Sequence, residues 1–166
     1  PSIVAMAEVK GIPGKRVVEG YIAGFETLCQ LANLLIPSHY AQGWHSTATL
    51  GPFGAAAAVS KLLGLDVEKT QHALNIAAST GSGLQANFGT MTKPMHAGQA
   101  ARSGTTAALL ASHGFTASDE ALEGKGGFFD LYAGDKELDV ANFPTDAEGL
   151  AIVNTERHIK KYPCCA

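Results

Sequence analysis

Two segments rich in alanine and glycine constrain the fold of this chain more than any other feature. They are TATLGPFGAAAAVSKLLG, residues 47–64, and MHAGQAARSGTTAALLASHG, residues 95–114. Alanine has the highest helix propensity of all residues, and the distance between two packed helices depends on the side chains at their contact. Both segments are therefore predicted to be helices whose small residues let neighbouring helices approach closely.

Helix signals cover most of the remaining chain. Apolar residues recur at a three-four spacing from 15 to 35, which predicts an amphipathic helix. Gly64 is expected to end the first alanine-rich helix, which Thr47 or Thr49 would cap, and Asp66 to cap the next one.

The second alanine-rich helix is expected to begin at Pro94, because proline suits the first helical position, with Lys93 as its cap. Short helical turns are predicted at 118–124 and 126–134, and one strand in the tail at 149–163. The fold class predicted is mainly α, a bundle of helices.

Composition and charge exclude several classes of protein. The chain has 166 residues, a net charge of −3 and no basic cluster, which argues against binding to nucleic acid or a membrane surface. Its three cysteines form no disulfide framework, it has no run of about 18 apolar residues, and its start does not resemble a signal peptide. A cytoplasmic protein is expected. Only 16% of the residues are charged, so another chain or domain is expected to cover part of the surface.

Acidic residues are nearly missing from one long window. Between Thr27 and Ser118 the only ones are Asp66 and Glu68. The same window holds four lysine or arginine side chains and five of the six histidines. These basic and titratable residues are Lys61, Lys69, Lys93, Arg102, His39, His45, His72, His96 and His113. A cleft formed by this window would be electropositive, so its predicted ligand is a small anion.

The helix expected at Pro94 places two bases at a positive helix end. Lys93 at the cap and His96 in the first turn are unfavourable there, unless a carboxylate binds to them and to the helix N–H groups. We expect Thr92, His96 and Gln85 to bind that substrate. The alternative is that Lys93 extends into water and His96 packs by one ring face.

His45 precedes the first alanine-rich helix in the stretch GWHSTATLG. An imidazole there has a pKa suited to proton transfer at neutral pH. The alternative is a buried histidine hydrogen-bonded to the backbone. The remaining histidines, His39, His72, His113 and His158, are interpreted as structural.

Other sequence signatures give weaker indications of function. GSGLQA, residues 81–86, formally matches a dinucleotide-binding fingerprint, but a predicted helix precedes it and no acidic residue follows near position 100. Its glycines are therefore interpreted as a break between helices, after which the segment LQANFG lines the cleft. The histidine and cysteine spacings do not suit a metal, and no G-x-S-x-G elbow is present. We expect no metal and no cofactor.

Four segments together resemble the MmgE/PrpD family: GWHSTATLGPFGAAAAVSKLLGLD, MTKPMHAGQAARSG, LEGKGGFF and KKYPCC. The family includes 2-methylcitrate dehydratase, cis-aconitate decarboxylase and iminodisuccinate epimerase. The resemblance implies that residues 1–150 belong to an all-helical domain and that 151–166 begin an α/β lid, in a homodimer. It also implies that the chain, which does not start with methionine, is a piece of a longer protein whose upstream and lid segments carry further site residues.

The resemblance also assigns site residues. It places the family's histidine at His45 and its lysine at Lys93, with His96 in the same motif, while Ser46 departs from a frequent proline. A 2-methylcitrate dehydratase-like lyase is the first expectation, and the decarboxylase and the epimerase are alternatives. In each reaction the imidazole would move a proton beside a carboxylate and the ammonium would stabilise the developing charge. A catalytically silent helical fragment that only packs or dimerises is the alternative of another class.

Overall fold

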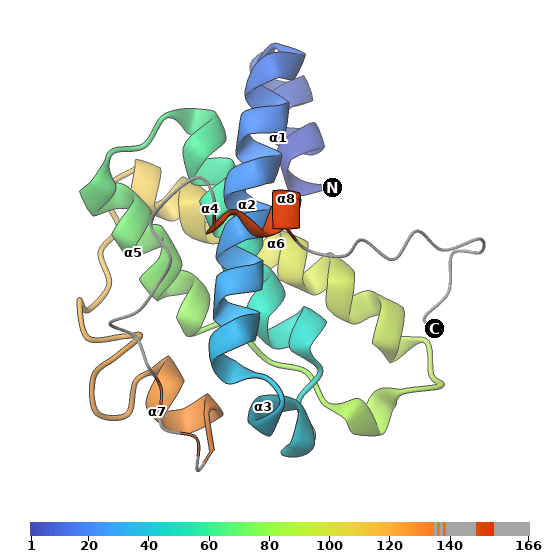
Figure 1. Ribbon diagram of the computed structural model, residues 1–166. Coiled ribbons are helices and arrows are strands. Elements are labelled where there is room, and N and C mark those ends of the chain that lie inside the picture. Colours follow the sequence, from blue (N-terminus) through green and yellow to red (C-terminus); the bar gives the residue numbers. More distant parts are fainter. Residues whose placement is uncertain (135, 137, 139–148, 155–166) are drawn as a thin grey trace.

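The structure, a computed structural model, describes residues 1–134, 136, 138 and 149–154 and is built from helices (Figure 1). Within these residues no strand forms, and a single isolated bridge pairs Trp44 with Leu84. The elements are α1 (Ser2–Lys10), α2 (Gly14–Leu35), α3 (Ser38–Ala41), α4 (Ser46–Leu63), α5 (Val67–Ala78), the 3₁₀ helix η1 (Gln85–Asn87), α6 (Thr92–Ser112), α7 (Phe128–Tyr132) and α8 (Ala151–Asn154). The prediction of a mainly α fold is confirmed. None of the described helices is both long and apolar enough to cross a membrane.

Helix α4 lies at the centre of the molecule, packed between α2 and α6, with α1 and α5 also against it (Figure 1). Its glycines and alanines set the spacing. A Cβ added to Gly104 of α6 would overlap the carbonyl of Pro52, and one added to Gly24 of α2 would overlap the carbonyl of Gly54. The predicted close packing of the alanine- and glycine-rich helices is confirmed.

Large apolar side chains of α4 complete the core. Leu50, Phe53 and Val59 are buried together with Leu35 of α2 and Phe128 of α7. Burying a side chain of this size contributes about 1.5–3 kcal/mol. The core therefore anchors α4 along its length and fixes the position of its first residue.

Several helix ends lie where the sequence predicts them. Gly64 follows α4 with a φ of 70°, and the Asp66 carboxylate accepts the Lys69 N–H at 2.8 Å as the cap of α5. The prediction that Thr47 or Thr49 caps α4 is wrong, because His45 holds the cap position with extended backbone.

Helix α6 begins two residues earlier than predicted. Its first residue is Thr92 and its cap is Met91, so Pro94 is the third helical residue and Lys93 is not the cap. A proline fits there because the first four N–H groups of a helix have no partner within it. Thr90 favours the earlier start, because its side-chain and backbone oxygens accept the N–H groups of Thr92 and Lys93.

Predictions for the last third of the chain have mixed outcomes. The helical turn at 126–134 is confirmed as α7. Residues 118–124 form turns instead of helix, because the carbonyls of Ala121 and Leu122 accept N–H groups from Phe128 and Phe129. In the predicted strand, 151–154 form α8, whose first two N–H groups donate to Glu26 of α2. Residues 155–166, which include His158 and most of the expected lid, lie outside the described part.

Candidate functional site

The loop before α4 is held by a segment that follows α5. The His45 N–H donates to the Gly83 carbonyl at 3.0 Å, and the Gln85 N–H donates to the Gly43 carbonyl at 2.9 Å. The Gln85 side-chain amide also donates to the carbonyls of Trp44 and Tyr40. These bonds fix the backbone on both sides of His45.

His45 meets His96 of α6, 51 residues further along the chain. Their Nδ1 atoms lie 2.9 Å apart, within hydrogen-bond distance. Both side chains are buried, with 9% and 6% of their surface exposed. The crossing of α4 and α6 therefore joins two of the residues that the sequence selected.

Lys93 lies beside this pair. Its amine is 4.9 Å from the centre of the Phe88 ring, a cation–π distance. The Phe88 ring packs edge-on against the His45 ring, with their centres 4.9 Å apart and an angle of 83° between planes. Lys93 and His45 thus contact the same aromatic ring, and the structure brings His45, Lys93 and His96 together.

The electrostatics of this cluster are positive. Burial lowers the pKa of the His45 imidazole, and its electrostatic interactions with His96 and Lys93 lower that pKa further. The two acidic residues of the window, Asp66 and Glu68, follow the other end of α4, whose 18 residues span roughly 27 Å. Because its pKa is lowered from 6.5, His45 is neutral at neutral pH and able to accept a proton.

The start of α6 does not offer the N–H groups that the sequence predicts for an anion. Thr92 N–H donates to the Thr90 hydroxyl and Lys93 N–H to the Thr90 carbonyl, each at 3.2 Å, and Pro94 has no N–H. The expectation of unbonded donors at these positions is wrong. The attraction for an anion must come from the side chains and the helix dipole.

The two other predicted substrate-binding residues lie near the same cluster. Gln85 uses its amide nitrogen to brace the His45 loop, and Thr92 is half-buried in the first turn of α6, next to Lys93. For both residues, contact with substrate stays a prediction.

His39 behaves as the structural histidine that the sequence predicts. It is fully buried, with Nε2 2.7 Å from the Thr49 hydroxyl and Nδ1 3.2 Å from the Tyr132 carbonyl. Burial lowers its pKa, although the bond to Tyr132 acts in the opposite direction. His72 is also structural, because its ring accepts the Ala117 N–H.

Sequence reasoning missed Gly83 and Phe88. Gly83 carries the carbonyl that holds His45, and a Cβ there would overlap Ala48 and lie 3.4 Å from the His96 ring. The only sequence signal for either residue was the helix break at 81–86 followed by LQANFG. The sequence thus marked the segment but not these two contacts.

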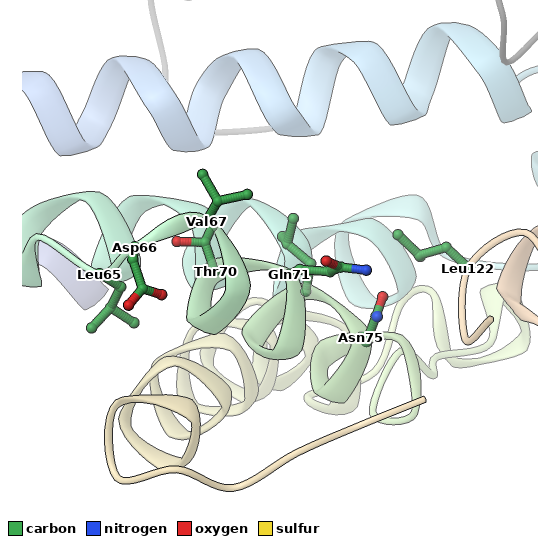
Figure 2. A pocket seen from close by; sticks show the side chains of 8 residues that line it. Leu65, Asp66, Val67, Thr70, Gln71, Asn75 and Leu122 are labelled. Carbon is green, nitrogen blue, oxygen red and sulfur yellow. The ribbon is translucent and has the colours of Figure 1, made fainter. Parts of the chain in front are cut away.

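A separate cavity of about 440 Å³ lies along α5 (Figure 2). Figure 2 shows Asp66, Gln71 and Asn75 on its wall, with Leu122 on another segment. Asn75 is 2% exposed and donates to the Ser118 carbonyl. Neither this cavity nor an apolar one of about 560 Å³ between α1, α2, α4 and α6 is lined by His45, Lys93 or His96.

Comparisons with known proteins show the family of the chain. The family model described as MmgE/PrpD N-terminal domain matches residues 1–141. Cis-aconitate decarboxylase of Homo sapiens is 42% identical over 90 residues, covering 54% of this chain and 19% of that protein. Cis-aconitate decarboxylase of Aspergillus terreus is 36% identical over 140 residues, covering 80% and 29%. The chain thus spans only about a fifth to three-tenths of the length of these relatives.

Proposed function

Because the chain belongs to the MmgE/PrpD family, we propose that it carries the proton-transfer groups of a lyase that acts on a small di- or tricarboxylate. The observation that carries the proposal is the buried His45–His96 contact beside Lys93. The carboxylates of the window from Thr27 to Ser118, those of Asp66 and Glu68, follow the far end of α4, roughly 27 Å away along the helix. The two imidazoles and the ammonium at the near end of α4 therefore favour an anionic substrate.

Each residue has a distinct role in the proposal. His45, kept neutral by burial and by neighbouring positive charge, exchanges a proton with a substrate carbon. Lys93 stabilises the negative charge that develops on the adjacent carboxylate. His96, Gln85 and Thr92 bind the substrate, His96 through its second ring nitrogen because Nδ1 is engaged.

The named relatives set the order in which reactions should be tested. The family resemblance gave dehydration of 2-methylcitrate as the first expectation, whereas the relatives named as cis-aconitate decarboxylases favour decarboxylation. In decarboxylation carbon dioxide leaves first, its electron pair stays on the substrate, and a proton is then added to carbon. In dehydration the proton leaves carbon before or with the hydroxyl group, and in epimerisation of iminodisuccinate it leaves and returns on the other face.

A homodimer and a cytoplasmic location complete the proposal. The family resemblance supports the first, and the cysteine content supports the second. The low fraction of charged residues is also consistent with a surface covered by a partner.

A turnover assay tests the function. cis-Aconitate and 2-methylcitrate are each incubated with the protein and followed by ultraviolet absorbance. His45→Ala should lower kcat by about 10²- to 10⁴-fold, the usual contribution of a proton-transfer group. Lys93→Met should lower kcat by about 10²- to 10³-fold, the usual cost of removing one group that stabilises developing charge. His113→Ala, at an exposed position after α6, is the matched control and should leave kcat unchanged. Full activity in the first two variants would overturn the assignment, and no turnover of either acid by the unaltered chain would favour the packing-only alternative.

A further inference from the structure

The contact between His45 and His96 joins two identical atoms. A hydrogen bond between two Nδ1 atoms 2.9 Å apart needs a proton on one of them and a lone pair on the other. Two neutral imidazoles meet this condition only if they adopt opposite tautomers. One ring then has a lone pair on Nε2, and the other has an N–H on Nε2.

The rings are held so that this bond persists. Gly83 contributes to both, since its carbonyl accepts the His45 N–H at 3.0 Å, and a Cβ added to it would lie 3.4 Å from the His96 ring. Phe88 packs edge-on against His45. Since the two histidines are also at least nine-tenths buried, water competes poorly for either Nδ1.

Positive charge near His45 favours one of the two possible pairs of tautomers. Among the described residues, the titratable groups that act on His45 are His96 and Lys93, both on α6, and the Lys93 amine lies over the Phe88 ring that packs against His45. With Nδ1 engaged, Nε2 is the one remaining ring nitrogen of His45. A neighbouring ammonium favours a lone pair over an N–H at that nitrogen, because the lone pair carries partial negative charge.

We propose that His96 is a positioning residue, which accepts the Nδ1–H of His45 and thereby holds Nε2 of His45 as the lone pair that exchanges a proton with substrate. The inference rests on the proposed function, because it names the atom through which His45 acts. This task uses Nδ1 of His96, whereas the proposed contact with the substrate uses Nε2 of the same ring.

The tautomers can be measured directly, without substrate, in the chain labelled with ¹⁵N-histidine. Long-range ¹H–¹⁵N correlation spectra at pH 8 should show a protonated Nδ1 on His45 and a protonated Nε2 on His96. The same protonated nitrogen on both rings, or the reverse assignment, would overturn the proposal. Because no substrate is present, this result is independent of whether either acid is turned over.

Two variants separate positioning from packing. His96→Asn keeps an oxygen acceptor near the position of Nδ1, so His45 should stay protonated on Nδ1. His96→Leu removes the acceptor, so His45 should shift toward the Nε2–H tautomer. An unchanged tautomer in folded His96→Leu would overturn the proposal, and the spectrum of the unaltered chain decides the question if that variant does not fold. His113→Asn is the control and should leave both rings unchanged.

Kinetics add a second readout once turnover is established. His96→Leu should lower kcat roughly 10- to 100-fold, the range for removing an outer partner that orients an active histidine, while His96→Asn should keep most of kcat. Both variants should raise KM, because both lack the Nε2 atom of His96 that is proposed to bind the substrate. Equal losses of kcat in the two variants would contradict a positioning role.

Discussion

The two ends of α4 differ in how their backbone groups are capped and in which charges lie beside them. At its C-terminal end, Gly64 adopts the left-handed conformation, and the Arg16 guanidinium donates to the carbonyls of Lys61 and Leu62 at 3.1 and 3.3 Å. Asp66 then caps the next helix. At the N-terminal end, His45 holds the cap position without a side-chain hydrogen bond to the helix, and the first turn contains no acidic residue.

The difference indicates what each end contributes. Gly64, Arg16 and Asp66 satisfy helix termini and place opposite charge at each pole, which stabilises the fold. The His45 end instead gathers Lys93 and His96 of α6 near a second positive helix terminus. Local rules are broken most often at functional sites, so this contrast supports the site proposed here.

The largest effect on the His45 end is expected from Gly83→Ala. The added methyl would overlap Ala48 and crowd the His96 ring, so the free energy of unfolding should fall by about 1–3 kcal/mol, the range for overpacking. Urea denaturation measures this change, and histidine NMR should show a displaced His45. Gly98→Ala, which meets nothing within 4 Å, is the control and should not destabilise. Equal stability of both variants would show that Gly83 does not brace the site.

At the other end, Asp66→Ala should cost about 1 kcal/mol, since it removes the acceptor for the Lys69 N–H. The His45 and His96 resonances should not move, because the two ends act separately. Asp66→Asn keeps an acceptor and should restore most of the stability. A shift of the His45 resonances in Asp66→Ala would mean that the ends are coupled.

The next effect is a dependence of stability on pH that arises at the His45 end. His45 and His39 have pKa values lowered from the ordinary 6.5, so the unfolded chain binds protons at a higher pH than the folded one. The contribution of these two histidines to the free energy of unfolding is present above pH 6.5 and is lost as the pH falls below 6.5.

Thermal unfolding at pH 7.5 and 5.5 should therefore show lower stability in acid. The loss should be smaller in His45→Gln and unchanged in His113→Gln, whose side chain is exposed. An equal acid loss in His45→Gln and the unaltered chain would exclude His45 as a source.

The smallest effect expected is a gain from Ser46→Pro. Ser46 is the first residue of α4, its hydroxyl is buried without a partner, and His45 before it has the extended backbone that a following proline favours. The free energy of unfolding should rise by about 0.4–1 kcal/mol in chemical denaturation. A loss of stability would mean that the serine hydroxyl has a role that the fold alone does not explain.

The sequence by itself determined the features that depend on a few neighbouring residues. The end of α4 at Gly64, the cap at Asp66 and the extent of α2 follow from local conformational preference and apolar spacing, and each lies where it was predicted. The deficit of acidic residues is also a property of the sequence. His45 and Lys93 could be selected from their motifs before any distance was known.

Only the tertiary structure decided how these groups meet. The Nδ1 contact joins residues 51 positions apart, and it depends on the crossing of α4 and α6 and on the missing side chain of Gly83. The start of α6 was misplaced because Thr90, outside the expected helix, supplies acceptors for its first N–H groups. Helix propensity and capping act over one turn, whereas a hydrogen bond between two buried rings depends on packing that no short stretch of sequence contains.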